Sequence, residues 1–466
     1  MKKNTGFIIF ITVCVLLCMV PSVCMIFAGS NEPIGNESVV EVPRLKEEDG
    51  NINVSLLSDF GNYFETHYAF RPALISLDAW IQERVFLVSN TETVVTGTDG
   101  WLYYSSTVND YLGRNQLSDR GMFNLAHNVS LLQDYVTGKG ARFLFMIAPN
   151  KNSLYGEHMP YYEQEKAGTI FNRNRLKESL EAEGVHYADA FALFDNNEEV
   201  LYLKHDSHWN NKGACMVYNE LMDALEKDHK TYENTPVTYA KSHRGDLSAM
   251  LYPGTKELEM DYTYEYEPSF EYIPSPVSSD PVSVEDYRIE TKKEDAEDHL
   301  LMYRDSFGNT LIPFIANEFQ SCFFTKATPY ILDLHMKQYN PNVVILEKAE
   351  RNMRDFAENP GVIPSPKANE NPANLYLASE ENCTVQACQA DMNFIEIAGV
   401  IPESDVSEKG RIYLQIQTPL GEKELYEAFT VSDNDSDYGY IVYLPLEKYG
   451  TIESLDKHAV RVYTEK

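Results

Sequence analysis

The sequence lacks the features that mark several classes of protein. Its 7 cysteines and 11 histidines show no pattern with the spacing of a zinc site. Basic residues are few, because 39 Lys and Arg stand against 71 Asp and Glu and leave a net charge of −32. This charge argues against nucleic acid as a partner, since binding phosphates requires a basic face. We expect no metal and no cofactor, and we interpret the acidity as surface solvation.

Only the N-terminus has an uncharged apolar run long enough to span a bilayer, from Phe7 to Ala28 after Lys2 and Lys3. The alternative is a signal peptide cleaved near Gly29, which would make the protein secreted. The run exceeds the usual signal-peptide core of about 7–15 residues. We therefore predict that residues 1–29 form an uncleaved single-pass anchor in the cell membrane. The lysines would stay in the cytoplasm and the rest of the chain would be extracytoplasmic.

The cysteines divide by their location along the chain. Three lie in the N-terminal apolar run and cannot crosslink the exported part. Cys215 and Cys322 fall in predicted core elements, where cysteine behaves as a small buried hydrophobe. Cys383 and Cys388 lie close together in a polar segment and are candidates for a disulfide, which an oxidising exterior permits.

A chain of 466 residues is too long for one ordinary core, and its pattern divides it. Residues 30–52 are polar and acidic and are expected to form a tether. Residues 53–362 alternate between strand and helix patterns, apart from an irregular insertion at 252–298 that either covers the site or decorates the sheet edge. Residues 370–466 contain short alternating stretches between turn residues, which predict a small antiparallel β-sandwich.

The elements expected within residues 53–362 alternate in type. The pattern predicts helices at 119–136, 175–183, 214–225 and 310–319, and strands at 142–148, 186–189, 200–203, 299–303 and 343–346. Such alternation predicts an α/β fold with a doubly wound parallel sheet. Ligands of these sheets bind beyond the carboxyl ends of the strands. The polar residues Asn150, Asp206, His208 and Ser306 fall at such ends.

Asp206, His208 and Ser306 have the residue types and placement of an acyl-transfer site. Ser306 follows a predicted strand and precedes a helix-like segment, so we expect an exposed hydroxyl near the backbone N–H groups of the helix start. Asp206 stands two residues before His208 and can hold the imidazole in the tautomer that accepts the serine proton. His205 is the rival imidazole but lacks this carboxylate. The non-catalytic alternatives are a helix N-cap for Ser306 and an Asx turn for Asp206.

The motifs Asp206–Trp209 and Asp305–Asn309 resemble those of the DHHW proteins and the related SGNH-like O-acetyltransferases, which modify alginate and other exported polysaccharides. The resemblance covers Asn53 to Arg354. Further segments fit the same pattern, namely Gly97–Tyr104, Ile147–Lys151 and Asn340–Glu347. Ser207 replaces the first histidine of the family motif, which leaves the acid and base positions intact. Gly245-Asp246-Leu247 also resembles a recurring family element, without an evident mechanism.

The resemblance implies a membrane-anchored, extracytoplasmic O-acetyltransferase that acetylates hydroxyls of a surface or secreted polysaccharide through an acyl-Ser306 intermediate. Activated acetyl donors are cytoplasmic, so it also implies a membrane-bound O-acyltransferase partner that passes acetyl outward. Two alternatives stay open. One is a carbohydrate esterase with the same triad, and the other is a non-catalytic glycan-binding component of an export complex.

The resemblance also assigns candidate roles to other parts of the chain. The Asn150 amide could donate to the oxyanion, as an asparagine does in SGNH enzymes, or belong to an ordinary turn. Lys151 could attract an anionic glycan, and Arg304 could orient substrate or pair with Asp305. Related acetyltransferases can carry a β-sandwich carbohydrate-binding module. Residues 370–466 are therefore expected to bind glycan or to serve in packing.

Overall fold

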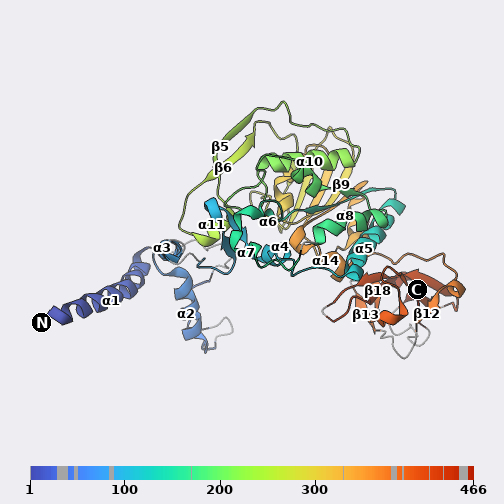
Figure 1. Ribbon diagram of the computed structural model, residues 1–466, viewed down its shortest axis with the longest axis horizontal. Helices are drawn as coiled ribbons and strands as arrows, with labels where there is room; N and C mark the ends of the chain where they lie inside the picture. Colours follow the sequence, from blue (N-terminus) through green and yellow to red (C-terminus); the bar gives the residue numbers. More distant parts are fainter. Residues whose placement is uncertain are drawn as a thin grey trace.

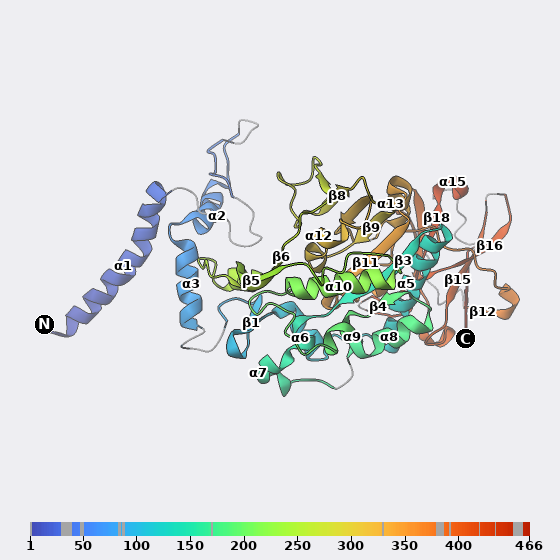
Figure 2. The same cartoon turned by 90° about the horizontal axis from the view of Figure 1, so that it is seen from above.

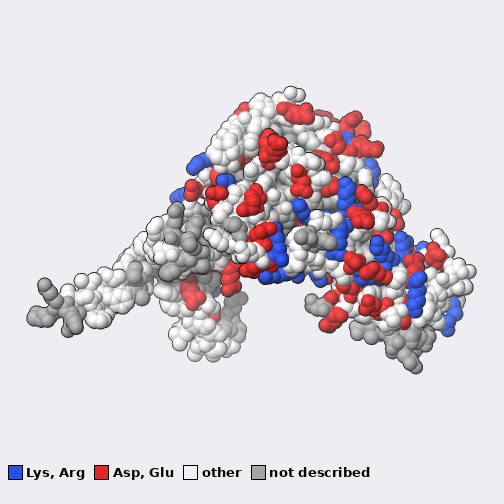
Figure 3. All heavy atoms as spheres, viewed as in Figure 1, with Lys and Arg blue, Asp and Glu red and all other residues white. Residues whose placement is uncertain are grey.

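The computed structural model contains a central α/β domain, an N-terminal group of helices and a C-terminal pair of β-sheets (Figure 1). It describes residues 2–28, 40–46, 51–82, 85, 89–168, 171–328, 330–378, 386–390, 393–418, 420–433, 435–450 and 460–466. Most of the predicted tether and the side chains of Cys383 and Cys388 lie outside the described residues. Figure 3 shows acidic side chains spread over the face in view with basic ones among them, as surface solvation predicts.

The N-terminal segment begins with a long apolar helix, α1 (Lys2–Ala28). Its stretch Thr5–Met25 is apolar enough to cross a membrane, and none of the most apolar window is buried against the protein. By length and composition α1 is a membrane anchor or a signal segment. Helices α2 (Leu56–His67) and α3 (Arg71–Ile81) follow, and Figure 2 shows all three at the end of the molecule opposite the C-terminal sheets.

The central sheet has seven strands in the order β4-β3-β11-β9-β10-β8-β7. Its parallel strands are β3 (Arg142–Ala148), β4 (Tyr187–Ala188), β9 (His299–Tyr303), β10 (Ser321–Thr325) and β11 (Val343–Ala349). An antiparallel edge is added by β8 (Arg288–Lys292) and β7 (Glu271–Ile273). Strands β3 and β11 are buried along almost their whole length, because helices cover both faces of the sheet.

Two hydrophobic cores lie on the two faces of this sheet. One face packs against α9 (Ala190–Asp195), α10 (Asn211–Ala224) and α12 (Ile312–Ile315). The other packs against α5 (Asp119–Gly138), α8 (Asn172–Ala182), α13 (Leu332–Tyr339) and α14 (Asp355–Glu358). The predicted doubly wound α/β fold is therefore confirmed, with a mixed rather than purely parallel sheet.

Smaller elements surround the carboxyl edge of the sheet. They are β1 (Val94–Thr96), β2 (Leu102–Tyr104), α4 (Val108–Tyr111), α6 (Lys151–Leu154), α7 (Pro160–Glu163), β5 (Val237–His243), α11 (Asp246–Leu251) and β6 (Glu259–Tyr264). Strands β5 and β6 pair as an antiparallel ribbon. This ribbon and the strands β7 and β8 carry most of the regular structure in and around the predicted insertion.

Two local predictions were wrong. Residues 200–203 do not form a strand, because the chain folds back on itself and only Tyr202 makes an isolated bridge, to Trp209. Residues 310–319 form no single helix. Instead a 3₁₀ turn at Phe307–Thr310 leads into the four-residue α12, after which the chain must re-enter the sheet at Ser321. The strand β10 that follows was not predicted, because an apolar run of five residues cannot be distinguished from helix by periodicity alone.

The C-terminal strands form two four-stranded antiparallel sheets, with the orders β12-β19-β15-β16 and β13-β14-β18-β17. The strands are β12 (Tyr376–Leu377), β13 (Gln386–Ala390), β14 (Phe394–Val400), β15 (Ile412–Gln417), β16 (Lys423–Glu427), β17 (Phe429–Val431), β18 (Gly439–Pro445) and β19 (Arg461–Thr464), and α15 (Leu446–Tyr449) follows β18. Residues such as Ile395, Leu414 and Val442 form a core between the sheets. This arrangement confirms the predicted β-sandwich fold.

Buried polar contacts join the sandwich to helix α5. The Asn128 amide donates to the carbonyls of Phe356 and Thr430, both at 2.8 Å, and its oxygen accepts the Thr430 N–H at 3.0 Å. The buried Arg120 guanidinium donates to the Gly410 carbonyl at 2.7 Å. The sandwich is thus packed on the α/β domain through buried hydrogen bonds, and its contact with glycan stays a prediction.

Asn128→Ala is expected to lower the free energy of unfolding by roughly 3 kcal/mol, because each buried backbone group left without a partner costs about 1–3 kcal/mol. Urea denaturation of the purified protein measures this loss. The matched control is Asn234→Ala at an exposed position, which should stay within about 0.5 kcal/mol of the parent. Equal stability of the two variants would contradict a role for Asn128 in joining the domains.

Candidate active site

Three side chains from two turns form one hydrogen-bonded line at the carboxyl edge of the sheet. The Nε2 atom of His208 lies 2.8 Å from Oγ of Ser306, and its Nδ1 lies 2.7 Å from Oδ1 of Asp206. Ser306 follows β9 and begins the 3₁₀ turn, whereas Asp206 and His208 lie in the loop before α10. The structure thus brings together the three residues predicted as a triad, in hydrogen-bonding order.

Hydrogen bonds fix the protonation state of this line. One oxygen of the buried Asp206 accepts from the backbone N–H and Nδ1 of His208, and the other accepts from Nε2 of His243 and the N–H of Asp246. Burial alone would raise the pKa of Asp206, but the hydrogen bonds from both histidines hold it well below its usual value. An ionised carboxylate only accepts, so Nδ1 of His208 carries the proton. Its Nε2 is then free to accept the Ser306 hydroxyl proton.

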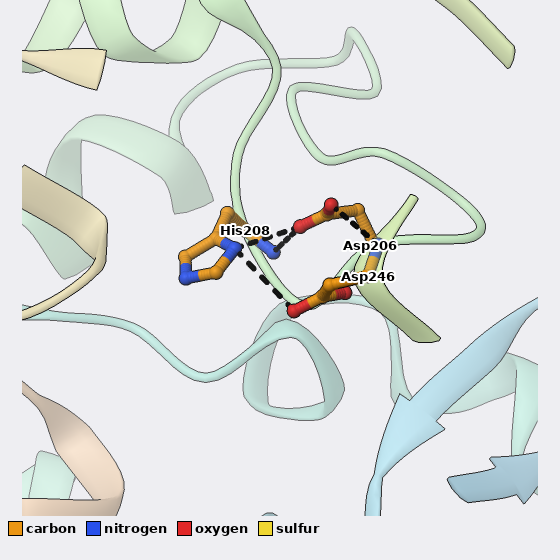
Figure 4. Close-up of side chains that lie close together, drawn as sticks. All are labelled: Asp206, His208 and Asp246. Carbon is orange, nitrogen blue, oxygen red and sulfur yellow. Dashed lines mark hydrogen bonds and ion pairs between the residues drawn. The ribbon is translucent and has the colours of Figure 1, made fainter. Parts of the chain in front are cut away.

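Asp246 lies beside the same imidazole, with its Oδ2 3.8 Å from Nδ1 of His208 (Figure 4). It accepts the N–H of Ser207 at 2.8 Å and the Ser207 hydroxyl at 2.5 Å. Gly245 precedes it, and a Cβ at this position would lie 2.1 Å from the His205 carbonyl oxygen. The Gly-Asp-Leu element therefore holds the loop that carries the acid and the base. In the sequence, only the resemblance of Gly245-Asp246-Leu247 to a recurring element of the DHHW proteins marks Asp246.

The turn that presents Ser306 is fixed to the neighbouring strand β11. The Asp305 carboxylate accepts the N–H of Phe307 at 2.9 Å and the N–H of Ala349 at 2.8 Å. Its own N–H donates to Glu347 at 2.9 Å, and burial raises the pKa of this glutamate well above its usual value. These contacts cross-link two strand ends and hold the serine backbone in place.

Aromatic packing supports the triad from the protein interior. The Phe307 ring lies 4.7 Å from the His208 imidazole and 4.8 Å from the Trp209 ring, measured between centroids. The buried Trp209 indole donates to Thr310 Oγ1 at 2.7 Å. The Arg351 guanidinium lies 5.6 Å from the Phe307 ring, and no sequence motif marks it. Burial opposes protonation of His208, and the positive charge of Arg351 adds to this effect.

The triad opens into a cavity of about 520 Å³. The facing wall comes from the predicted insertion and the ribbon next to it, through Tyr264, Tyr266, Val284 and Glu285. The insertion at 252–298 therefore covers the site, in addition to extending the sheet with β7 and β8. Its tyrosine rings give the cavity apolar faces opposite the serine.

Asn150, the predicted oxyanion donor, is directed elsewhere. Its buried side-chain amide donates to Asp110 at 3.1 Å, and its backbone N–H donates to Glu350 at 2.8 Å. It does not line the cavity that contains Ser306. The backbone N–H groups of Ser306 and Gly308 stay the predicted oxyanion donors, because the N–H of Phe307 donates to Asp305.

The side chains of Lys151 and Arg304 were predicted to contact substrate. In the structure both donate hydrogen bonds to groups of the protein itself. The buried Lys151 ammonium donates to the backbone carbonyls of Leu203, Lys204 and Asp206, and burial lowers its pKa to about 8. It braces the triad loop from inside and cannot attract a glycan from solution. Arg304 donates to the carbonyls at 284, 286 and 305 and to Asn309, so it joins the insertion to the serine turn.

Among the described residues, one group of side chains has ligand atoms close enough to share a metal ion. The group consists of Asp206, His208 and Asp246, whose ligand atoms lie within 4.8 Å of one another. Their hydrogen bonds do not favour that use. Both oxygens of Asp206 accept two N–H donors each, and Nδ1 of His208 bears a proton. Metal binding requires the imidazole nitrogen to be free of its proton, so the donor set fits a proton relay better than a metal site.

Asp246→Asn is expected to shift the acid limb of the pH–rate profile to lower pH. Burial lowers the pKa of His208, but the charges of Asp206 and Asp246 outweigh it and raise the value. The protonated imidazole cannot accept the serine proton, so activity is lost as pH falls through this pKa. Removing one carboxylate charge lowers the pKa and extends activity to lower pH. The measurement is kcat/KM for p-nitrophenyl acetate against pH.

The control for this shift is Asp261→Asn, because Asp261 lines the same cavity and is not among the charges that raise the pKa of His208. An acid limb that moves equally in both variants would mean that general charge, rather than Asp246, sets the profile.

Comparisons with known proteins find one matching family model and several similar structures. Residues 94–287, which include Asp206 and His208, match the family model of the SGNH hydrolase-like domain of the acetyltransferase AlgX. The chain is similar to the structure of Bacillus cereus PatB1, with 18% identity over 57% of this chain and 96% of that chain and a TM-score of 0.43. The family match confirms the resemblance predicted from the sequence.

Two other solved structures are similar at lower identity. A DHHW family protein from Eubacterium siraeum DSM 15702 has 14% identity over 57% of this chain and 95% of that chain, with a TM-score of 0.41. Pseudomonas aeruginosa AlgX has 13% identity over 81% of this chain and 96% of that chain, with a TM-score of 0.36. A search of the curated proteins finds no match.

Proposed function

We propose that this chain, whose residues 94–287 match an SGNH hydrolase-like acetyltransferase domain, is an O-acetyltransferase that works outside the cytoplasm and transfers acetyl groups to hydroxyls of a polysaccharide through Ser306. The observation that carries the proposal is the hydrogen-bonded line from Ser306 through His208 to Asp206, which opens into a cavity. A nucleophile, its base and the group that orients the base are the parts that covalent acyl transfer requires. The apolar helix α1 supports a location at the membrane.

In the first step Ser306 takes the acetyl group from its donor. Its Oγ bonds to the acetyl carbonyl carbon while its proton moves to Nε2 of His208. The bond to the donor's leaving group breaks, and that group departs with the proton. Backbone N–H groups of the serine turn stabilise the intermediate oxyanion, and Asp206 stabilises the imidazolium.

In the second step a sugar hydroxyl replaces the leaving group. His208 removes the hydroxyl proton while the sugar oxygen bonds to the acetyl carbon. The bond between that carbon and Ser306 Oγ then breaks, and Oγ takes the proton back from His208. The apolar faces of Tyr264 and Tyr266 suit the packing of a sugar ring across the cavity. An oriented hydroxyl has a high effective concentration and outcompetes water, which separates a transferase from an esterase.

The acetyl donor must reach the outer side of the membrane. We infer that a membrane-bound O-acyltransferase supplies the group, because activated acetyl esters are made in the cytoplasm. Retention of α1 would keep the enzyme beside such a partner.

The purified protein incubated with p-nitrophenyl acetate, with and without oligosaccharide acceptors, tests the proposal. Faster consumption of ester with acceptor present and an acetylated sugar by mass spectrometry would support transfer. Steady deacetylation of acetylated polymers without any transfer would instead establish the esterase. Binding of oligosaccharide with no turnover of either kind would leave the glycan-binding component as the function.

A further inference from the structure

Helix α3 has apolar side chains on two opposite sides. On one side Ala79 is fully buried against Leu247 and Leu251 of α11. On the other side Leu77 and Trp80, one helical turn apart, are 53% and 54% exposed. A helix with a single partner would carry polar residues on its outer face. The second apolar side of α3 therefore lacks a covering partner among the described residues.

Helix α2 also has an exposed apolar side. Leu57 and Phe60 lie one turn apart and are 88% and 54% exposed. Ser58, Asn62 and Glu65 lie on other sides of the helix. We name the side chains of Leu57, Phe60, Phe70, Leu77, Trp80 and Ile81 the α2–α3 apolar surface.

We propose that the α2–α3 apolar surface lies in the headgroup region of the lipid bilayer that α1 anchors. The inference rests on retention of α1 in the proposed function. The chain leaves α1 at Ala28 and enters α2 at Leu56, and both views place the three helices at one end of the molecule (Figure 2). Amphipathic helices that carry Trp, Phe and Leu on one face lie in this region of a membrane.

This placement would set the position of the active site above the membrane. Helix α3 lies against α11 through Ala79, and α11 begins at Asp246. Asp246 in turn holds Asp206 and Ser207 of the triad loop. A bilayer on one side of α3 and α11 on its other side would keep the catalytic loop at a fixed height, where an acetyl group delivered through the membrane can reach it.

The three tryptophans make the proposal directly measurable. Trp80 is 54% exposed, whereas Trp101 and Trp209 are 2% and 1% exposed. We would reconstitute the full chain into phosphatidylcholine vesicles whose lipids are brominated either near the headgroup or deep in the acyl chain. Shallow bromine is expected to quench the emission of Trp80 strongly and deep bromine weakly. Trp80→Phe should abolish the quenching.

A matched control places tryptophan on an exposed aromatic position at the far end of the molecule. Tyr376→Trp in the Trp80→Phe background should show no quenching, because β12 lies opposite α1 in both views. Leu77→Glu should reduce quenching of Trp80 while turnover of p-nitrophenyl acetate stays at the parent rate. Alkaline extraction checks separately that α1 keeps the chain in the membrane.

An anchored, active chain whose Trp80 is not quenched would overturn the proposal and leave the proposed function intact. A chain released by alkaline extraction would contradict the anchor on which the inference rests. Protection of Trp80 that depends on protein concentration rather than on brominated lipid would assign the surface to a second copy, which also overturns it.

Discussion

Ser306→Ala is expected to lower kcat for p-nitrophenyl acetate by roughly 10³-fold or more, because loss of a triad nucleophile removes the covalent route altogether. The hydroxyl makes one hydrogen bond, to Nε2 of His208, while the turn is held by other groups. The fold should therefore survive, with an unchanged thermal unfolding midpoint. Initial rates of p-nitrophenol release measure the effect.

A second readout follows the acyl group itself. Rapid quenching of the parent protein with ester should leave one acetyl group on the peptide that contains Ser306, and the alanine variant should leave none. Ser404→Ala, at an exposed position in the C-terminal sandwich, serves as the matched control and should behave as the parent. Turnover of the Ser306 variant near the parent rate would contradict the assignment of the nucleophile.

The proximity of Asp206, His208 and Ser306 could be predicted because its signals are local in the sequence. Asp206 and His208 are two residues apart, so a single turn presents both groups whatever the remainder of the fold. Ser306 follows an apolar run, and the carboxyl ends of parallel strands meet at one edge of a sheet. Only the contact between His208 and Ser306, which lie on two segments far apart in the sequence, required knowledge of the fold.

The groups around the triad could not be predicted in the same way. His243 reaches Asp206 from a strand 37 positions away, and nothing in its own neighbourhood marks it. Asn150 and Lys151 carry the residue types of a binding site, but their roles depend on which carbonyls and carboxylates the packing places beside them. Charge in a sequence does not show whether a side chain faces solvent or the interior.

The same limit applies to the fold. Long elements such as α5 were predicted nearly to their ends because apolar positions recur over several turns. A short element such as β10 offers too few residues for a period to show. The role of the insertion as a cavity wall depends on contacts between β6 and the triad loop, which no local pattern contains.

His208→Ala and Asp206→Asn are expected to reduce kcat/KM by roughly 10²–10⁴-fold, whereas His205→Ala should leave it nearly unchanged. Only His208 contacts both Ser306 and Asp206. An amide at 206 no longer fixes the proton on Nδ1 of His208. The imidazole can then adopt the other tautomer, in which Nε2 carries the proton and cannot accept the serine proton. The imidazole of His205 faces Gly100, outside the cavity, and burial lowers its pKa.

His205 is the control that makes this prediction decisive, because it lies three residues from His208 on the same loop. Asp206 accepts four hydrogen bonds, so its variant needs a thermal unfolding curve beside each rate. A slow but stably folded Asp206→Asn protein locates the loss in the chemistry, and an unfolded one is replaced by Asp206→Glu. An equal loss of activity in His205→Ala would show that the wrong imidazole had been assigned as the base.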